Sequence, residues 1–439
     1  MENQTSNDLH RKKPDVIAKH QEKRLSLAAE ANRYHKKWFM DMKERVAQGE
    51  PFAFVTAQVP QEIFRAMDIP YVVNQWWSSI CSAKQMSSYY FGLLNEKGYR
   101  QDLCQYCSLS LASSLEPEKG PWGGLPKPTL LVTRYSCDSQ AKIFELMSKQ
   151  YGDIPLFLLE STVTSTIPEN WWEKMPHDWD ELFDSHRLDL MVEEYKGLIR
   201  FLEEHTGKTF SETKFREIMK LVNEQAAYNK KSRDLIAGTS PSPVSITDTI
   251  PAVMIPQWHR GTQWAVDNAR KLYEEIKARV ENGDSVIKNE RLRIMWVGRA
   301  LWYNMGLFQH FEKQYGAVFI WAIYLAIAAD GYARYGGDPL RALASRFAGM
   351  EDLLHMPPWN SEWYLDQAKK NNVDAVVHMV TEGHMGSGGT YFIRKAFEDA
   401  GIPILELRAD AVDARKWDED SIIGRIEEFF ENELGVKPQ

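Results

Sequence analysis

The 439-residue chain lacks several features that would assign it to a familiar class of protein. It has no basic excess, and a net charge of −8 is unfavourable for general binding to nucleic acid or to anionic membranes. Its longest apolar run, from Ala317 to Ala329, is shorter than the roughly 20 residues that a membrane span needs. No apolar segment follows the charged amino terminus, as it would in a secretory signal. We therefore expect a soluble, cytoplasmic protein that does not bind nucleic acid or membrane.

The chain also lacks the glycine-rich motifs that bind nucleotides. It has no Walker A sequence and no GxGxxG after an expected strand, so binding of ATP or NAD is not indicated. The glycine-rich segment GHMGSGG, at 383–389, precedes an expected helix. Its backbone N–H groups are suited to an anion, although its glycines could equally mark only a tight loop.

Cysteine is scarce, and its few positions are clustered. The chain contains Cys81, Cys104, Cys107 and Cys137, and none elsewhere. Disulfides are not expected in a cytosolic protein of this size, so the clustering indicates metal ligation. The alternative is that each cysteine is a small buried hydrophobic residue. A Cys-x-x-Cys pair occurs in zinc, iron–sulfur and redox sites, but the second pair that a closed zinc-ribbon site would need is absent.

Hydrophobic patterning divides the chain into four parts. Residues 1–50 are polar with a helical pattern, and residues 51–184 alternate short apolar strands with helices. Long amphipathic helices dominate residues 185–289, interrupted by TSPSPVSITDTIP, which we expect to be a connector because it is rich in Pro, Ser and Thr. The alternation of strands and helices returns over residues 290–439. Strands and helices that alternate with short links are typical of parallel sheets. We predict an α/β protein with two parallel-sheet domains, flavodoxin- or Rossmann-like, separated by a helical segment.

Ligands of open parallel sheets collect at the carboxyl ends of the strands, and two such domains can enclose a cleft. Cys137 directly follows the expected strand TLLVTRYS, and TEGHMGSGG follows the expected strand VDAVVHMV. Cys104 and Cys107 lie in DLCQYCS, which we interpret as a loop. We expect these three segments to meet in the cleft. The other expected strands are PFAFVTAQVP, YVVNQWW, DIPLFLLES, RLRIMWVG, GAVFIWAIY and IPILELRAD.

Several segments, taken in their order and spacing, resemble one enzyme family. GYRQDLCQYCSLSLA, LLVTRYSCDSQAKIFELMSKQYG, VDAVVHMVTEGHMGSGG and AGIPILELRADAVD are similar to the 2-hydroxyacyl-CoA dehydratase and benzoyl-CoA reductase family. WHRGTQWAVDNARKLYEEIKARVENG is most similar to the larger, B-like subunit of benzoyl-CoA reductase. The similarity runs from about Phe52 to Glu431.

The resemblance implies one subunit of a heteromeric iron–sulfur enzyme that acts on acyl-CoA thioesters. Family enzymes combine two related subunits, often with a [4Fe–4S] cluster in each. A separate ATP-hydrolysing activator protein supplies one electron, and the thioester carbonyl becomes a ketyl radical. That radical leads to loss of the 2-hydroxyl group in the dehydratases and to ring reduction in benzoyl-CoA reductase. The partners implied are a paralogous subunit, the activator and the acyl-CoA substrate.

The resemblance also implies cluster ligands, but the set is incomplete. Cys104 and Cys137 match the first two family cysteines, whereas the third, expected at about Glu382, is absent. Cys107 could substitute, or Glu382 or His384 could bind iron. Alternatively, this subunit is a non-catalytic structural partner without a cluster. Without a cluster, Glu382 or His384 could still act as an acid or base near the thioester.

Two further groups are candidates for the substrate site. Trp76, Trp77, Ser78 and Ser79 occupy a turn at the end of an expected strand and could line the acyl pocket, with ordinary core packing as the alternative. His259 and Arg260, in PQWHRGT, could hold the CoA phosphates or the thioester. The alternative for this second group is a salt bridge at the start of a helix.

Overall fold

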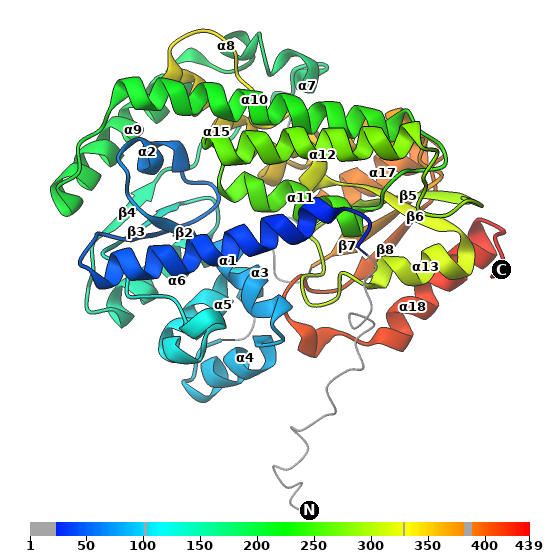
Figure 1. Ribbon diagram of the computed structural model, residues 1–439, viewed down its shortest axis with the longest axis horizontal. Helices are drawn as coiled ribbons and strands as arrows, with labels where there is room; N and C mark the ends of the chain where they lie inside the picture. The colour runs from blue at the N-terminus through cyan, green and yellow to red at the C-terminus, as the bar shows by residue number, and fades with distance from the viewer. Residues whose placement is uncertain (1–22, 101–102, 328–329, 382–388) are drawn as a thin grey trace, which may run out of the picture.

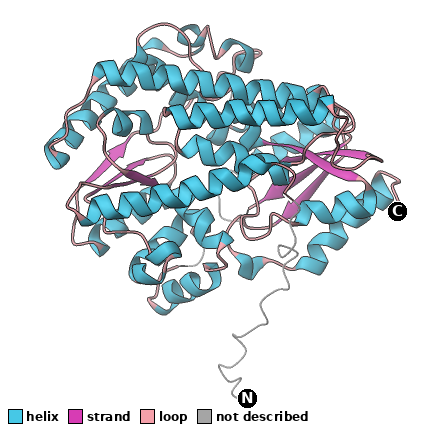
Figure 2. Cartoon of the chain, viewed as in Figure 1, coloured by secondary structure: helices cyan, strands magenta, loops and turns pink. Residues whose placement is uncertain are grey.

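The computed structural model describes residues 23–100, 103–327, 330–381 and 389–439. These residues form two four-stranded sheets with the strand orders β2-β1-β3-β4 and β6-β5-β7-β8. All strand pairs are parallel, and the two sheets lie apart with helices between and around them (Figure 2). The predicted fold class, an α/β protein with two parallel-sheet domains, is confirmed. In the described part of the chain, no helix is both long enough and apolar enough to cross a membrane.

The first sheet forms around two short strands that are buried along their whole length. In the register, Ala53 lies opposite Tyr71 on one side and Leu130 on the other. Its four strands are β1 (Ala53–Val55), β2 (Tyr71–Val73), β3 (Leu130–Arg134) and β4 (Leu156–Leu159). Its helices are α2 (Gln61–Ala66), α3 (Asn74–Ala83), α4 (Ser87–Glu96), α5 (Gln105–Leu115) and α6 (Asp138–Gln150). Central strands covered on both faces require continuous apolar runs, which AFV and LLVTR nearly provide.

The second sheet has longer strands and is built in the same way. Its central strand, β5 (Leu292–Val297), is buried throughout and pairs with β6 (Ala317–Ala322) and β7 (Ala375–Val380). The two edge strands are β6 and β8 (Ile404–Arg408). The helices of this half are α13 (Leu307–Tyr315), α14 (Ile323–Ile327), α15 (Pro339–His355), α16 (Pro357–Lys370), α17 (Thr390–Asp399) and α18 (Glu419–Glu428).

Long helices occupy the chain between the two sheets. They are α9 (Ser185–Thr206), α10 (Glu212–Ala237), α11 (Ile246–Trp258) and α12 (Gln263–Glu281), preceded by the short helices α7 (Trp171–Lys174) and α8 (Trp179–Leu182). Capping side chains set where they begin: Asp184, Ser211 and Thr262 accept backbone N–H bonds at the starts of α9, α10 and α12. Helices α10 and α12 lie side by side, and α1 (Ser26–Ala47) crosses the molecule beneath them (Figure 1).

Three local predictions differ from the structure. DLCQYCS is not a loop beyond Cys104, because α5 begins at Gln105 and carries Cys107 in its first turn. The strand expected over YVVNQWW ends at Val73, where α3 begins. The connector expected over TSPSPVSITDTIP becomes helix α11 from Ile246 onward. Each difference places a helix directly after a short strand or a turn.

The two sheet domains, which are separated in sequence by the long helices, are joined by direct hydrogen bonds. The Ser82 hydroxyl, in α3, donates to the Val412 carbonyl at 3.0 Å, and the Gln85 amide donates to the Tyr303 carbonyl at 3.0 Å. Because these bonds link residues more than 200 positions apart in the chain, they help to fix the space between the sheets. The predicted limits of the four sequence parts, at 50, 184 and 289, remain a prediction.

Candidate active site between the two sheets

A cavity of about 220 Å³ lies between the two sheets. Strands from both sheets supply its walls with the residues at or just beyond their carboxyl ends, as expected for parallel α/β domains. These residues are Ala57 and Gln58 after β1, Gln75 after β2, Ser136 and Cys137 after β3, Val297, Gly298 and Arg299 at β5, Ile323 and Tyr324 after β6, and His378 to Thr381 at β7. The expected convergence of strand ends from both domains on one cleft is therefore confirmed.

Most of the cavity wall is apolar or aromatic. The helices contribute Met254 and Trp258 from α11, Met350 and Leu354 from α15, Tyr364 from α16 and Ile393 from α17, and loops add Trp302 and Tyr332. A wall of this kind suits a small ligand with an apolar body and a few polar atoms. Two of the chain's 15 tryptophans, Trp258 and Trp302, line the cavity.

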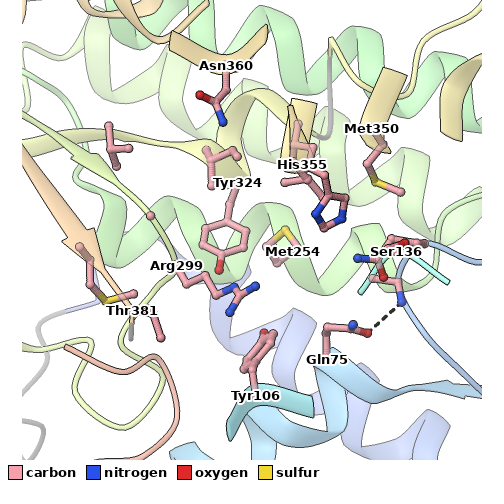
Figure 3. A pocket seen from close by; sticks show the side chains of 18 of the residues that line it. Gln75, Tyr106, Ser136, Met254, Arg299, Tyr324, Met350, His355, Asn360 and Thr381 are labelled. Atoms are coloured by element: carbon pink, nitrogen blue, oxygen red, sulfur yellow. Dashed lines mark hydrogen bonds between the residues drawn. The ribbon is translucent and has the colours of Figure 1, made fainter. Parts of the chain in front are cut away.

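Three polar side chains, Arg299, Tyr106 and Tyr324, meet at one corner of the cavity (Figure 3). The Arg299 guanidinium carbon lies 5.1 Å from the centre of the Tyr106 ring. Burial alone would lower the pKa of Arg299, but nearby thiols and phenols raise it overall. Burial raises the pKa of both tyrosines, so both remain neutral phenols at neutral pH.

Several other polar side chains of the cavity have a buried atom without a hydrogen-bond partner among the described residues, and Ser136 and His378 are two of them. The atoms are the Ser136 hydroxyl oxygen and the His378 Nδ1. Burial lowers the pKa of His378 to about 4, so its imidazole is neutral at neutral pH. A neutral imidazole can donate through one nitrogen and accept through the other. A bound ligand could satisfy either group.

A row of amides forms another part of the wall. The Gln75 side-chain oxygen accepts a bond from the Ala57 N–H at 2.8 Å, and the Gln140 amide donates to the Thr133 hydroxyl and to the Arg134 carbonyl, both at 3.1 Å. Gln75 and Gln140 are themselves linked at 3.4 Å. These bonds hold the strand ends of the first sheet in place and orient both amides.

The predicted acyl-pocket residues Trp76, Trp77 and Ser78 lie in α3, next to Gln75. All three are buried, with exposed fractions of 3%, 0% and 0%. Of this stretch, Gln75 is the residue that lines the cavity. Trp77 donates its indole N–H to the Ser113 hydroxyl at 2.8 Å. Their contacts are those of core residues directly behind the cavity wall.

The predicted CoA-binding residues His259 and Arg260 are engaged within the protein. The His259 Nε2 lies 2.7 Å from the His35 Nδ1, and the Arg260 Nε lies 2.7 Å from a Glu62 carboxylate oxygen. Arg346 contacts the same oxygen at 2.9 Å. This ion pair is the alternative that the sequence left open for Arg260. Next to it, Tyr332 lines the cavity and lies 4.9 Å from the Arg260 guanidinium carbon.

The predicted residues Glu382 and His384 lie outside the described part of the chain. Thr381, the last described residue before them, lines the cavity at the end of β7.

Comparison with known proteins agrees with this geometry. Residues 56–432 match the family described as 2-hydroxyglutaryl-CoA dehydratase, D-component. The chain belongs to this family. It is 25% identical over 398 residues to the (R)-2-hydroxyisocaproyl-CoA dehydratase alpha subunit of Clostridioides difficile, covering 88% of this chain and 90% of that protein. It is also 25% identical, with the same coverage, to the (R)-phenyllactyl-CoA dehydratase alpha subunit of Clostridium sporogenes.

Cys104, Cys107 and Cys137, the candidate metal ligands, lie at or near the cavity. Cys107 and Cys137 line the cavity, and Cys104 is the N-cap residue of α5. A hydrogen bond with Cys104, together with burial, raises the pKa of the Cys107 thiol, and burial raises the pKa of Cys137.

The described residues do not by themselves complete a metal site. Within residues 23–100, 103–327, 330–381 and 389–439, no group of three or more His, Cys, Asp or Glu side chains is arranged to hold a metal ion. Any iron ligand set would need at least one further donor or a rearrangement of the thiols.

Sequence reasoning missed Arg299, Tyr324 and His378. Arg299 directly follows the expected strand RLRIMWVG, and Tyr324 ends the expected strand GAVFIWAIY. His378 lies within VDAVVHMV, where its polarity is unusual for a central strand. Their positions at strand ends were a usable signal, because that edge of a parallel sheet faces the ligand.

Proposed function

We propose that this chain is one subunit of a heteromeric 2-hydroxyacyl-CoA dehydratase and that its cavity holds the acyl-thioester end of the substrate. The observation that carries the proposal is the cavity itself, which combines six strand ends, a largely apolar wall and one polar corner in a member of the dehydratase family. The named activities of both relatives are dehydrations of 2-hydroxyacyl-CoA thioesters, so dehydration is preferred over aryl-CoA reduction.

The overall reaction would be a redox-neutral loss of water. The C2–hydroxyl bond and one C3–hydrogen bond of the substrate break, and a C2–C3 double bond forms in the 2-enoyl-CoA product. The C3–hydrogen is a weak acid, so a route that places negative charge on the thioester oxygen lowers the barrier. The apolar wall supports this route, because excluding water strengthens electrostatic interactions with that charge.

Further details of the proposal rest on the family resemblance. They are a [4Fe–4S] cluster, an ATP-hydrolysing activator that supplies one electron, a ketyl radical of the thioester and a paralogous subunit as partner. Cys104, Cys107 and Cys137 would be the thiol ligands, with Glu382 or His384 as the further donor. The CoA part of the substrate would lie toward His259 and Arg260. Ser78 would contribute to the acyl pocket from its position behind the cavity wall.

The second candidate function is a cluster-free subunit that completes the substrate cleft of its partner. It is favoured by the missing third cysteine and by the lack of a three-ligand group among the described residues. The two candidates differ in whether this chain's thiols matter for iron content.

Serine substitutions in the assembled complex separate the two candidates. We expect Cys104→Ser and Cys137→Ser each to lower the iron content of the anaerobically purified complex, because thiolates are the usual cluster ligands. We expect the turnover of the same complex to fall at least about tenfold. The matched control is Cys81→Ser, which replaces a fully buried cysteine away from the cavity. Unchanged iron and turnover in the first two variants would establish the cluster-free subunit instead.

A further inference from the structure

We infer that Tyr106, Tyr324 and Arg299 form an oxyanion-binding corner that holds the carbonyl oxygen of an acyl thioester. The inference rests on the proposed function and assigns three residues of the cavity to one atom of its substrate. It involves hydrogen bonds only, with no covalent or redox step.

The first argument is the direction of the two phenol protons. The Tyr106 hydroxyl accepts a bond from the Trp302 indole N–H at 3.0 Å, and the Tyr324 hydroxyl accepts one from the Ala300 backbone N–H at 3.1 Å. A phenol oxygen that accepts a bond still has its own proton to donate. No described residue accepts either proton in the hydrogen bonds of this structure. Both protons are therefore available to a ligand.

The second argument is the convergence of the donors. The Tyr106 and Tyr324 hydroxyls point toward the Arg299 guanidinium from opposite sides (Figure 3). The Tyr324 ring also contacts the Trp302 ring, with centroids 5.6 Å apart. The indole that supplies a bond to Tyr106 thus packs against Tyr324, and the two phenols are held as one unit. All three donors line the same cavity.

The third argument is charge. Arg299 is a cation at the edge of an otherwise mostly apolar cavity, and both tyrosines stay neutral donors because burial disfavours their phenolate forms. One cation and two neutral donors match an oxygen that carries partial negative charge and gains more during reaction. A thioester carbonyl oxygen is such an atom in the proposed substrate. A cavity that bound only an alkyl chain would not need these three hydrogen-bond donors.

The test compares two ligands that differ only at the oxygen. A saturated acyl-CoA thioester and the corresponding S-alkyl CoA thioether, in which CH₂ replaces the carbonyl, are titrated calorimetrically into the full-length chain. We expect wild-type protein to prefer the thioester, and Tyr106→Phe and Tyr324→Phe each to reduce that preference about three- to tenfold, the range for one hydrogen bond. The matched control is Tyr315→Phe, whose hydroxyl donates to Glu431 at 2.8 Å outside the cavity.

Each outcome has a distinct meaning. If both ligands bind but the preference for the thioester is the same in all variants, the oxyanion corner is wrong and the proposed function stands. If neither ligand binds wild-type protein, the proposed function and the inference both fail. Arg299→Gln should also reduce the preference, and the two phenylalanine variants decide the matter if that protein does not fold.

Discussion

At the scale of single residues, the buried pair of His35 and His259 is the most unusual polar contact outside the cavity. Both imidazoles are almost fully buried, and their facing nitrogens lie 2.7 Å apart. Burial lowers the pKa of His35 to about 3 and lowers that of His259 well below its ordinary value, the latter with a contribution from His35. Trp76 packs against His35 with ring centroids 4.4 Å apart. The pair therefore links α1 to the aromatic core behind the cavity in its neutral form.

This pair predicts a loss of stability in mild acid. The unfolded histidine takes up a proton near pH 6.5, but the folded His35 does not until about pH 3. Its stabilising effect is thus complete above pH 6.5 and declines as the pH falls toward 3. The free energy of unfolding of the wild-type protein should fall between about pH 6.5 and pH 5. In His35→Gln this fall should be smaller by about 1 to 2 kcal/mol. Urea denaturation at the two pH values measures it.

A matched substitution at an exposed histidine controls for this experiment. His186→Gln, in α9, replaces a solvent-exposed imidazole and should leave the pH dependence as in wild-type protein. If His35→Gln and wild-type protein show the same decrease between pH 6.5 and pH 5, the neutral buried pair is not an important source of the acid sensitivity.

At the scale of elements, α1 is attached to the rest of the molecule by its first residues. Arg24 donates to Asp248 at 3.3 Å and to Glu312 at 2.6 Å, and both carboxylates are nearly inaccessible to solvent. The Ser26 N–H, at the start of α1, donates to Glu275 of α12 at 2.7 Å. Leu25, at the N-cap, provides no side-chain cap. Acidic residues from other helices therefore take the place of a local capping residue.

Removing Arg24 should weaken the whole fold. Arg24→Ala leaves two buried carboxylates without their cation, and we expect the free energy of unfolding to fall by about 3 kcal/mol. Arg45→Ala in the same helix removes an exposed ion pair with Glu50 and should cost less than about 1 kcal/mol. Urea denaturation at pH 7 compares the two variants. Equal losses would mean that Arg24 does not anchor α1.

The sequence predicted the strands better than the helices that follow them. All eight expected strands form, because apolar runs between turn residues have few alternatives in a parallel sheet. The helix at Gln105 was missed because QYCSLSLASSL is buried over nearly its whole surface and shows no amphipathic period. Helix α11 was missed because it contains Pro251 and Pro256, whose cost is offset by burial of almost every residue around them.

At the scale of the whole molecule, two sheets far apart in sequence share one site. Cys107 and Cys137 were predicted to reach the cleft because cysteine stands out and one of them follows a strand. The strand-end positions of Arg299 and Tyr324 made them candidates but did not single them out, since arginine and tyrosine are common residues. Only the packing of the two domains selects these two. The sequence places residues at the ends of strands, but the opposing domain determines which of them meet.

The central claim is that the cavity between the sheets binds the acyl end of a CoA thioester. The most direct test is calorimetric titration of full-length Leu354→Trp with a 2-hydroxyacyl-CoA, because Leu354 lines the cavity and a larger side chain would fill it. Leu190→Trp, at an exposed position of α9, is the matched control. We predict that Leu354→Trp weakens binding at least about tenfold, whereas the control binds as wild-type protein does. Wild-type affinity in a folded Leu354→Trp protein would contradict the account.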